Sequence, residues 1–158
     1  MTPQNKPVRA ENSSENEIGK IRERIYAGIF GQITKAEENG FYLEAITLYE
    51  SLITDRLESV LSVATGTNYQ FKNLGPLIDD VKKYMPSTPL ASLVIERLDA
   101  WRISRNKALH QMAKLQEGQL KDFEQEYLLC EGICREGKSI FRAIDKEVVK
   151  EKARRDRP

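Results

Sequence analysis

The strongest structural signal in the chain is the segment FYLEAITLYESLITDRLESVLSVATG, residues 41–66. Its apolar side chains recur every three or four positions, which is the spacing of one face of an α-helix. A helix with so wide an apolar face needs cover on several sides, so we expect it to be central in a bundle or covered by a partner chain. The face consists of Ala45, Tyr49, Leu52, Val60 and Ala64, widened by Ile46, Ile53, Leu57 and Leu61.

The same spacing recurs in four further segments, and none of the chain shows the alternation typical of a strand. A first helix is expected from residue 16 to ENG at 38–40, and a short third one within residues 73–89. A fourth is expected to begin after STP and to carry the following pattern until EG at 117–118 interrupts it, and a long last helix covers 120–148. The expected stripe of the first helix is Ile18, Ile21, Ile25, Ile29 and Ile33. The sequence therefore predicts an all-α protein, an antiparallel bundle of about five helices.

The bundle is expected to form a single domain over residues 16–150. Residues 1–15, with two prolines and a cluster of Ser, Asn and Glu, have little to bury and predict a flexible tail, and residues 151–158 form a basic end. The formal net charge of +1 means that any basic surface must be local. No apolar run approaches the roughly 20 residues of a membrane span, and the polar N-terminus does not look like a secretory signal. We therefore expect a cytoplasmic protein that does not enter a membrane.

The chain has two cysteines, Cys130 and Cys134, four positions apart on one helical face. Together with a single histidine they do not provide the four ligands that a zinc site usually needs. We expect both to be small core residues, and we expect no metal site and no cofactor.

The segment WRISRNKALHQM, residues 101–112, holds the only tryptophan and the only histidine of the chain. On an ideal helix, Val94, Leu98 and Trp101 form one apolar stripe, and Arg105 takes the next place on it. A guanidinium in that place keeps its charge and needs a partner, which can be a carboxylate, a backbone carbonyl or a bound phosphate.

Asn106 and His110 are four residues apart and lie side by side on an adjacent face. Arg105 is about 140° away from His110, so a straight helix cannot bring the two side chains to one atom. A bend, a curled arginine or a second chain could do so, and this geometry favours a site at an interface. In the alternative interpretation, Arg105 holds a carboxylate of the 41–66 helix, such as Asp55 or Glu58, and has no other role.

The letters RNKALH have the form Arg-Asn-x-x-x-His, which resembles the signature of the HEPN superfamily. These are small all-α domains, and many of them are metal-independent ribonucleases. The resemblance implies that Arg105, Asn106 and His110 are catalytic, and that two chains pair with their motifs facing each other across a cleft where RNA is cut. The candidates for substrate binding are Arg102, Lys107 and Arg56, although a helix–helix salt bridge is an equally good interpretation of Arg56.

These residue types suit the cleavage of RNA, whose own 2′-hydroxyl is the nucleophile. A histidine can move protons near neutral pH, and an arginine can hold the charge of the phosphorane. The asparagine can orient the imidazole or donate to the phosphate, and the expected products carry a 2′,3′-cyclic phosphate and a 5′-hydroxyl. The resemblance implies a role in defence against phage, in stress or in a toxin–antitoxin pair, with an antitoxin or inhibitor protein as a possible further partner.

Two other interpretations remain open from the sequence. Some HEPN-like domains do not cut RNA and act as nucleotide- or protein-binding modules, in which the motif would hold a dimer together. The chain could also be a helical regulator that touches nucleic acid through its basic end.

Overall fold

The protein is all α-helical in the computed structural model, which describes residues 17–69, 71–112, 114, 117–118 and 122–155. None of these residues is in a β-strand. Helices α4, η1 and α5 follow one another without a break, so the described residues form five helical rods, and the predicted all-α bundle is confirmed. The predicted tail, 1–15, lies outside the described residues. The elements are α1 (Glu17–Glu38), α2 (Tyr42–Thr65), α3 (Leu74–Tyr84), α4 (Pro89–Leu93), the π-helical turn η1 (Val94–Leu98), α5 (Asp99–Gln111) and α6 (Phe123–Arg155).

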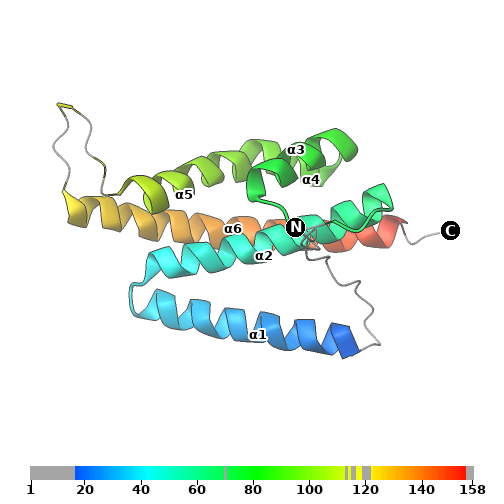
Figure 1. The fold of residues 1–158 in the computed structure, drawn as a ribbon, viewed down its shortest axis with the longest axis horizontal. Coiled ribbons are helices and arrows are strands. Elements are labelled where there is room, and N and C mark those ends of the chain that lie inside the picture. The colour runs from blue at the N-terminus through cyan, green and yellow to red at the C-terminus, as the bar shows by residue number, and fades with distance from the viewer. Residues whose placement is uncertain (1–16, 70, 113, 115–116, 119–121, 156–158) are drawn as a thin grey trace, which may run out of the picture.

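Helices α2 and α6 form the centre of the bundle, with α1 on one side and α3 to α5 on the other (Figure 1). Helices joined by a loop, such as α1 and α2 or α5 and α6, are antiparallel (Figure 1). The central pair runs in the same direction instead. The rings of Tyr42 and Tyr127 lie 6.2 Å apart near the start of both helices, and Lys152 donates a hydrogen bond to Ser59 near their ends.

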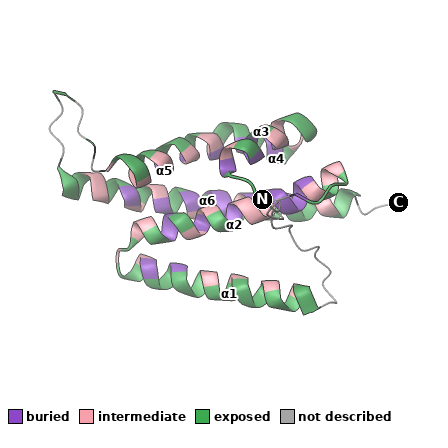
Figure 2. Ribbon diagram, in the orientation of Figure 1, coloured by how far each residue is buried: buried purple, intermediate pink, exposed green. Residues whose placement is uncertain are grey.

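The predicted apolar face of α2 is the core of the molecule. Every residue of that face is buried except Ala64, which is half-buried, and Figure 2 shows the buried residues concentrated on α2 and α6. The helix ends at Gly66, whose φ of 67° is a left-handed conformation that glycine adopts without strain. The expectation that this helix is central is therefore confirmed.

The predicted stripe of α1 is only partly correct. Ile33 is buried, but the side chains of Ile18, Ile21 and Ile25 are 40%, 46% and 55% exposed. The start of α1 turns a neighbouring face to α2 instead, where the hydroxyl of Tyr26 donates to Asp55 at 2.6 Å. Tyr26, and not Ile25, therefore faces α2 at this point.

Helix α6 continues through Arg155, so the predicted domain boundary at residue 150 falls inside it. Glu151 is buried at 7% exposure and accepts hydrogen bonds from Arg154 and Arg155. The described part of the predicted basic end is thus held by a carboxylate of its own helix, while residues 156–158 lie outside the described residues.

Both cysteines are buried in α6, as predicted. The thiol of Cys134 lies 3.7 Å from the carboxylate of Glu37, and burial, assisted by that carboxylate, raises the pKa of Cys134 to about 12. The thiolate form is therefore disfavoured near neutral pH, which agrees with a packing role.

Helices α4, η1 and α5 form one long helix that carries the motif. Thr88 caps its start by accepting a hydrogen bond from the backbone of Ala91 at 3.1 Å, and Pro89 follows in the first turn. The predicted stripe of Val94, Leu98, Trp101 and Arg105 is buried throughout. The indole of Trp101 donates to the carbonyl oxygen of Ile133 on α6 at 2.8 Å, which fixes α5 against α6.

The contact between α5 and α6 depends on a glycine. A Cβ added at Gly137 would lie 2.8 Å from Cζ2 of the Trp101 ring, whereas one added at Gly132 meets nothing within 4 Å. We expect Gly137→Ala to lower the free energy of unfolding by about 1–3 kcal/mol through overpacking. Gly132→Ala is the matched control and should raise it by up to about 1 kcal/mol through helix propensity. Urea denaturation measures both, and equal effects would show that the indole does not pack on Gly137.

Candidate active site

The motif of α5 lines a pocket of about 400 Å³ that α2 and the start of α3 complete. Arg105, Asn106 and His110 all line it, so the structure gathers the three predicted catalytic residues within one chain. The full lining consists of Glu50, Asn73, Leu74, Gly75, Pro76, Arg102, Arg105, Asn106 and His110.

The breadth of the pocket explains how one helix supplies all three side chains. Seen down an ideal helix, Asn106 and His110 lie about 100° and 140° from Arg105, and Arg102 lies about 60° from it on the same side. The pocket therefore covers a wide arc of α5, and its side chains surround a space without meeting at one atom. A second chain is not needed to bring the motif residues to a common pocket.

Arg105 is the most buried charged residue of the pocket, at 8% exposure. Its Nη2 forms an ion pair with Oε1 of Glu50 on α2, and its Nη1 donates to Oδ1 of Asn106 at 2.6 Å. Its Nε is buried without a hydrogen-bond partner among the described residues. Burial lowers the pKa of Arg105, but arginine remains a cation in proteins, so the charge persists beside Glu50.

The carboxylate that holds Arg105 differs from the two that the sequence suggested. Asp55 accepts from Tyr26, and Glu58 accepts from the backbone of Lys72 at 2.9 Å. Glu50 takes the place instead. The sequence did contain a signal for it, because Glu50 interrupts the line of Ile46, Ile53 and Leu57 on α2 just as Arg105 interrupts the apolar stripe of α5.

Asn106 and His110 differ in how they are held. The oxygen of the Asn106 amide accepts from Arg105, so its NH₂ is the group left to donate. The imidazole of His110 is exposed and has no hydrogen-bond partner among the described residues. The asparagine thus orients Arg105, and the imidazole is open to a ligand or to water.

The three substrate-binding candidates fall in different places. Arg102 lines the pocket, and its guanidinium lies 2.9 Å from Asp99. This arginine is the main cause of the lowered pKa of Asp99.

Arg56 is absent from the lining of the pocket. It forms an ion pair with Asp145 on α6, and its guanidinium lies 5.5 Å from the centre of the Tyr26 ring. The helix–helix salt bridge that was the other interpretation of Arg56 is therefore present.

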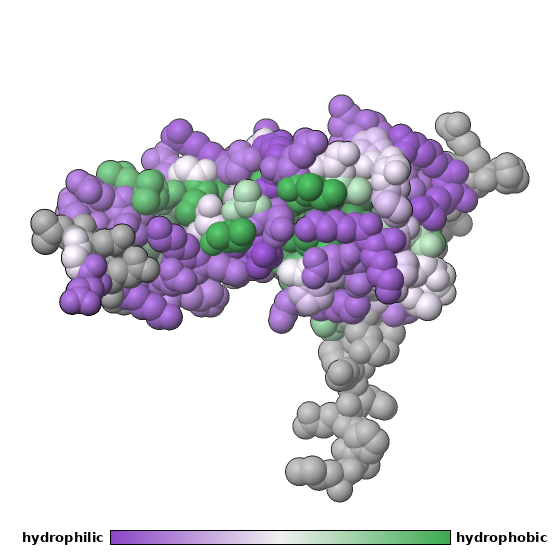
Figure 3. Space-filling view, turned by 90° about the horizontal axis from the view of Figure 1, so that it is seen from above, coloured by the Kyte–Doolittle hydropathy of each residue, from purple (hydrophilic) through white to green (hydrophobic). Residues whose placement is uncertain are grey.

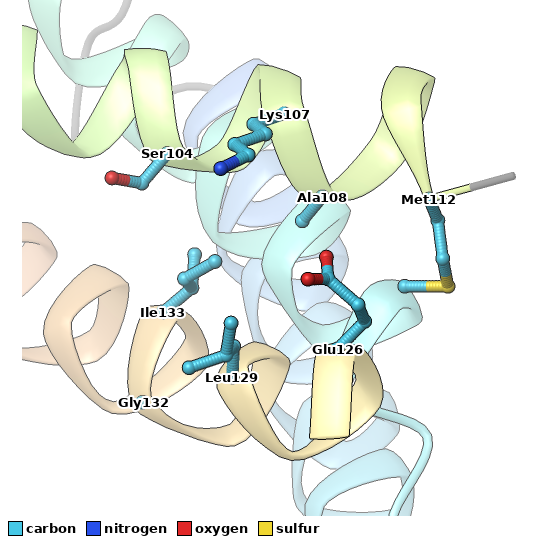
Figure 4. A pocket seen from close by; sticks show the side chains of 8 residues that line it. All are labelled: Ser104, Lys107, Ala108, Met112, Glu126, Leu129, Gly132 and Ile133. Carbon is cyan, nitrogen blue, oxygen red and sulfur yellow. The ribbon is translucent and has the colours of Figure 1, made fainter. Parts of the chain in front are cut away.

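Lys107 lines a second, more apolar pocket of about 350 Å³ between α5 and α6 (Figure 4). Lys107 of α5 and Glu126 of α6 flank an interior formed by Ala108, Leu129 and Ile133. Figure 3 looks onto the α3 to α5 side of the molecule and shows hydrophobic side chains at the surface among hydrophilic ones. Leu129 of this lining is 61% exposed, and its sequence neighbour Leu128 and Ile103, which precedes Ser104, are exposed to a similar degree.

The described residues contain no cluster of three or more His, Cys, Asp or Glu side chains that could hold a metal ion. Nor does this part of the chain contain a helix with the length and apolar character to cross a membrane. Comparisons of the chain with known protein families, curated proteins and solved structures found no match.

Proposed function

We propose that this protein is a metal-independent endoribonuclease, as its resemblance to the HEPN superfamily implies. The observation that carries the proposal is that Arg105, Asn106 and His110 line one pocket, with Arg102 at the same surface. If the short motif had occurred by chance, there would be no reason for its three fixed residues to line the same pocket. The pocket also offers the chemical groups that cleavage of RNA needs.

The reaction is an attack of the 2′-hydroxyl on the adjacent phosphorus, which gives a 2′,3′-cyclic phosphate and a 5′-hydroxyl. Arg105 and Arg102 supply positive charge for the phosphate and the phosphorane. His110 supplies an imidazole that can exchange protons. The NH₂ of Asn106 adds a neutral donor to the phosphate oxygens.

The active form is a homodimer, and a cellular inhibitor or antitoxin protein is a further expected partner. The apolar surface around the pocket between α5 and α6 supports pairing, because exposed patches of this kind commonly mark contacts with other proteins. Lys107 and Glu126 are of opposite charge on its two sides, so two copies could face each other with unlike charges in contact. The expected setting is the cytoplasm, in defence, stress response or a toxin–antitoxin system.

The test is incubation of the purified protein with single-stranded and structured RNA in EDTA. We expect cleavage without added metal, with 2′,3′-cyclic phosphate and 5′-hydroxyl ends identified by mass spectrometry and by kinase labelling. Sedimentation of the same sample gives the number of chains in the active species. Intact RNA under all conditions, or products with 5′-phosphate ends, would contradict the proposal.

A second candidate function is a non-catalytic module that binds a nucleotide or a protein. The ion pair between Arg105 and Glu50 favours it, because the guanidinium is already neutralised in the free chain. In that case Arg105→Ala changes the stability of the protein or its dimer, and no RNA is cut by the wild-type protein at any concentration. The RNA assay and sedimentation together therefore separate the two functions.

A further inference from the structure

Glu50 is a residue of the pocket to which the motif assigns no role. Its side chain is 21% exposed and lines the same cavity as His110 and Arg102. Oε1 is engaged by Arg105, whereas Oε2 has no partner among the described residues. The pocket therefore contains a partly exposed carboxylate oxygen, held in place through its neighbour.

Cleavage by the 2′-hydroxyl needs one group to accept a proton and another to donate one. The side chains of the pocket that can do either near neutral pH are Glu50 and His110, because arginine stays protonated and the amide of Asn106 does not titrate. A carboxylate in an ion pair is ionised and so enters the reaction able to accept a proton. The imidazole is then left to donate.

We propose that Glu50 is the general base of this site and His110 its general acid, an assignment that rests on the proposed ribonuclease function. Oε2 of Glu50 takes the proton of the 2′-hydroxyl while the bond from O2′ to phosphorus forms. The bond from phosphorus to O5′ breaks, and the departing O5′ takes a proton from the His110 imidazolium. Glu50 ends protonated and His110 neutral, and exchange with water restores both.

The ion pair with Arg105 couples this proton transfer to the movement of charge. As Glu50 accepts the proton it loses its negative charge, and at the same moment the phosphorane gains one. A neutral carboxyl group no longer forms an ion pair with Arg105, so the guanidinium can interact with the negative charge of the phosphorane. The guanidinium thus stabilises the transition state more than the ground state, which is the condition for acceleration.

The test compares two RNA oligonucleotides that contain one linkage cut by the wild-type protein. In the second oligonucleotide, sulfur replaces the bridging O5′ at that linkage, so the thiolate leaves without needing a proton. We expect His110→Ala to lose about 10²- to 10⁴-fold in rate on the oxygen substrate and to regain most of it on the sulfur substrate. Glu50→Gln should lose a similar factor on both substrates.

Glu50→Asp keeps a carboxylate that can accept a proton and should retain more activity than Glu50→Gln, whose amide cannot. Circular dichroism establishes that each variant is folded. If Glu50→Gln does not fold, Glu50→Asp on the two substrates still decides, since its rate loss must persist with sulfur. The assignment is overturned if a Glu50 variant is rescued by sulfur or cuts as fast as wild type. If wild type cuts neither oligonucleotide nor any other RNA, the ribonuclease function fails first.

Discussion

Replacing His110 by alanine is expected to lower the rate of RNA cleavage by about 10²- to 10⁴-fold, because the variant lacks the imidazole proposed to donate a proton to the RNA. The free energy of unfolding should change by less than about 0.5 kcal/mol, since the imidazole is exposed and has no hydrogen-bond partner among the described residues. The two quantities are measured on the same preparation, by cleavage of a labelled RNA and by urea denaturation. Loss of activity with an unchanged free energy of unfolding would show that His110 takes part in the cleavage reaction.

Glu96→Ala is the matched control for this substitution. Glu96 is exposed on η1, in the same continuous helix, and lines neither the motif pocket nor the apolar pocket between α5 and α6. We expect it to cut RNA at the wild-type rate. If His110→Ala also cuts at that rate, the histidine has no catalytic role, and if both variants lose activity equally, the loss reports on the helix rather than on the imidazole.

The fold could be predicted from the sequence wherever burial follows one dominant apolar face. Helix α2 is surrounded by α1, α3 and α6, so its wide face had to be buried whatever the details of packing. Helix α1 is different because it lies at the edge of the bundle, where Tyr26 faces Asp55 of α2 and Ile21 and Ile25 stay exposed. The spacing of apolar residues does not show which of two neighbouring faces of such a helix is covered. The shared direction of α2 and α6 is likewise a property of the loops and packing of the whole chain.

The lining of the motif pocket could be predicted in part. The motif positions and Arg102 lie at one pocket, and the isolation of Arg105 on an apolar stripe correctly indicated a buried charge in need of a partner. Which carboxylate meets Arg105 depends on the position of α5 along the axis of α2. The spacing of apolar residues within either helix does not determine that position. The matching interruption of the apolar face at Glu50 restricts the choice.

The ion pair of Arg105 and Glu50 should dominate the stability of this region. Replacing Glu50 by leucine leaves a guanidinium at 10% side-chain exposure without its counter-charge, and we expect a loss of about 3–5 kcal/mol in the free energy of unfolding. Arg105→Leu should cost less, because the carboxylate that it leaves behind is 21% exposed and water can reach it. Urea denaturation of the two variants gives both values.

The double variant Glu50→Leu/Arg105→Leu removes both charges and should recover most of the loss, because leucine side chains need no counter-charge when buried. The resulting interaction energy, the loss in the double variant less the two single losses, is expected to be strongly negative, whereas sites that do not interact give additive losses. Additivity would show that the pair is not formed in solution. The double variant separates activity from stability, because it regains its fold but lacks Glu50, the proposed base, and Arg105, the proposed phosphate-binding cation. Its failure to cut RNA would therefore show that the buried pair serves the site, while full cleavage by this stable variant would limit the pair to holding α5 on α2.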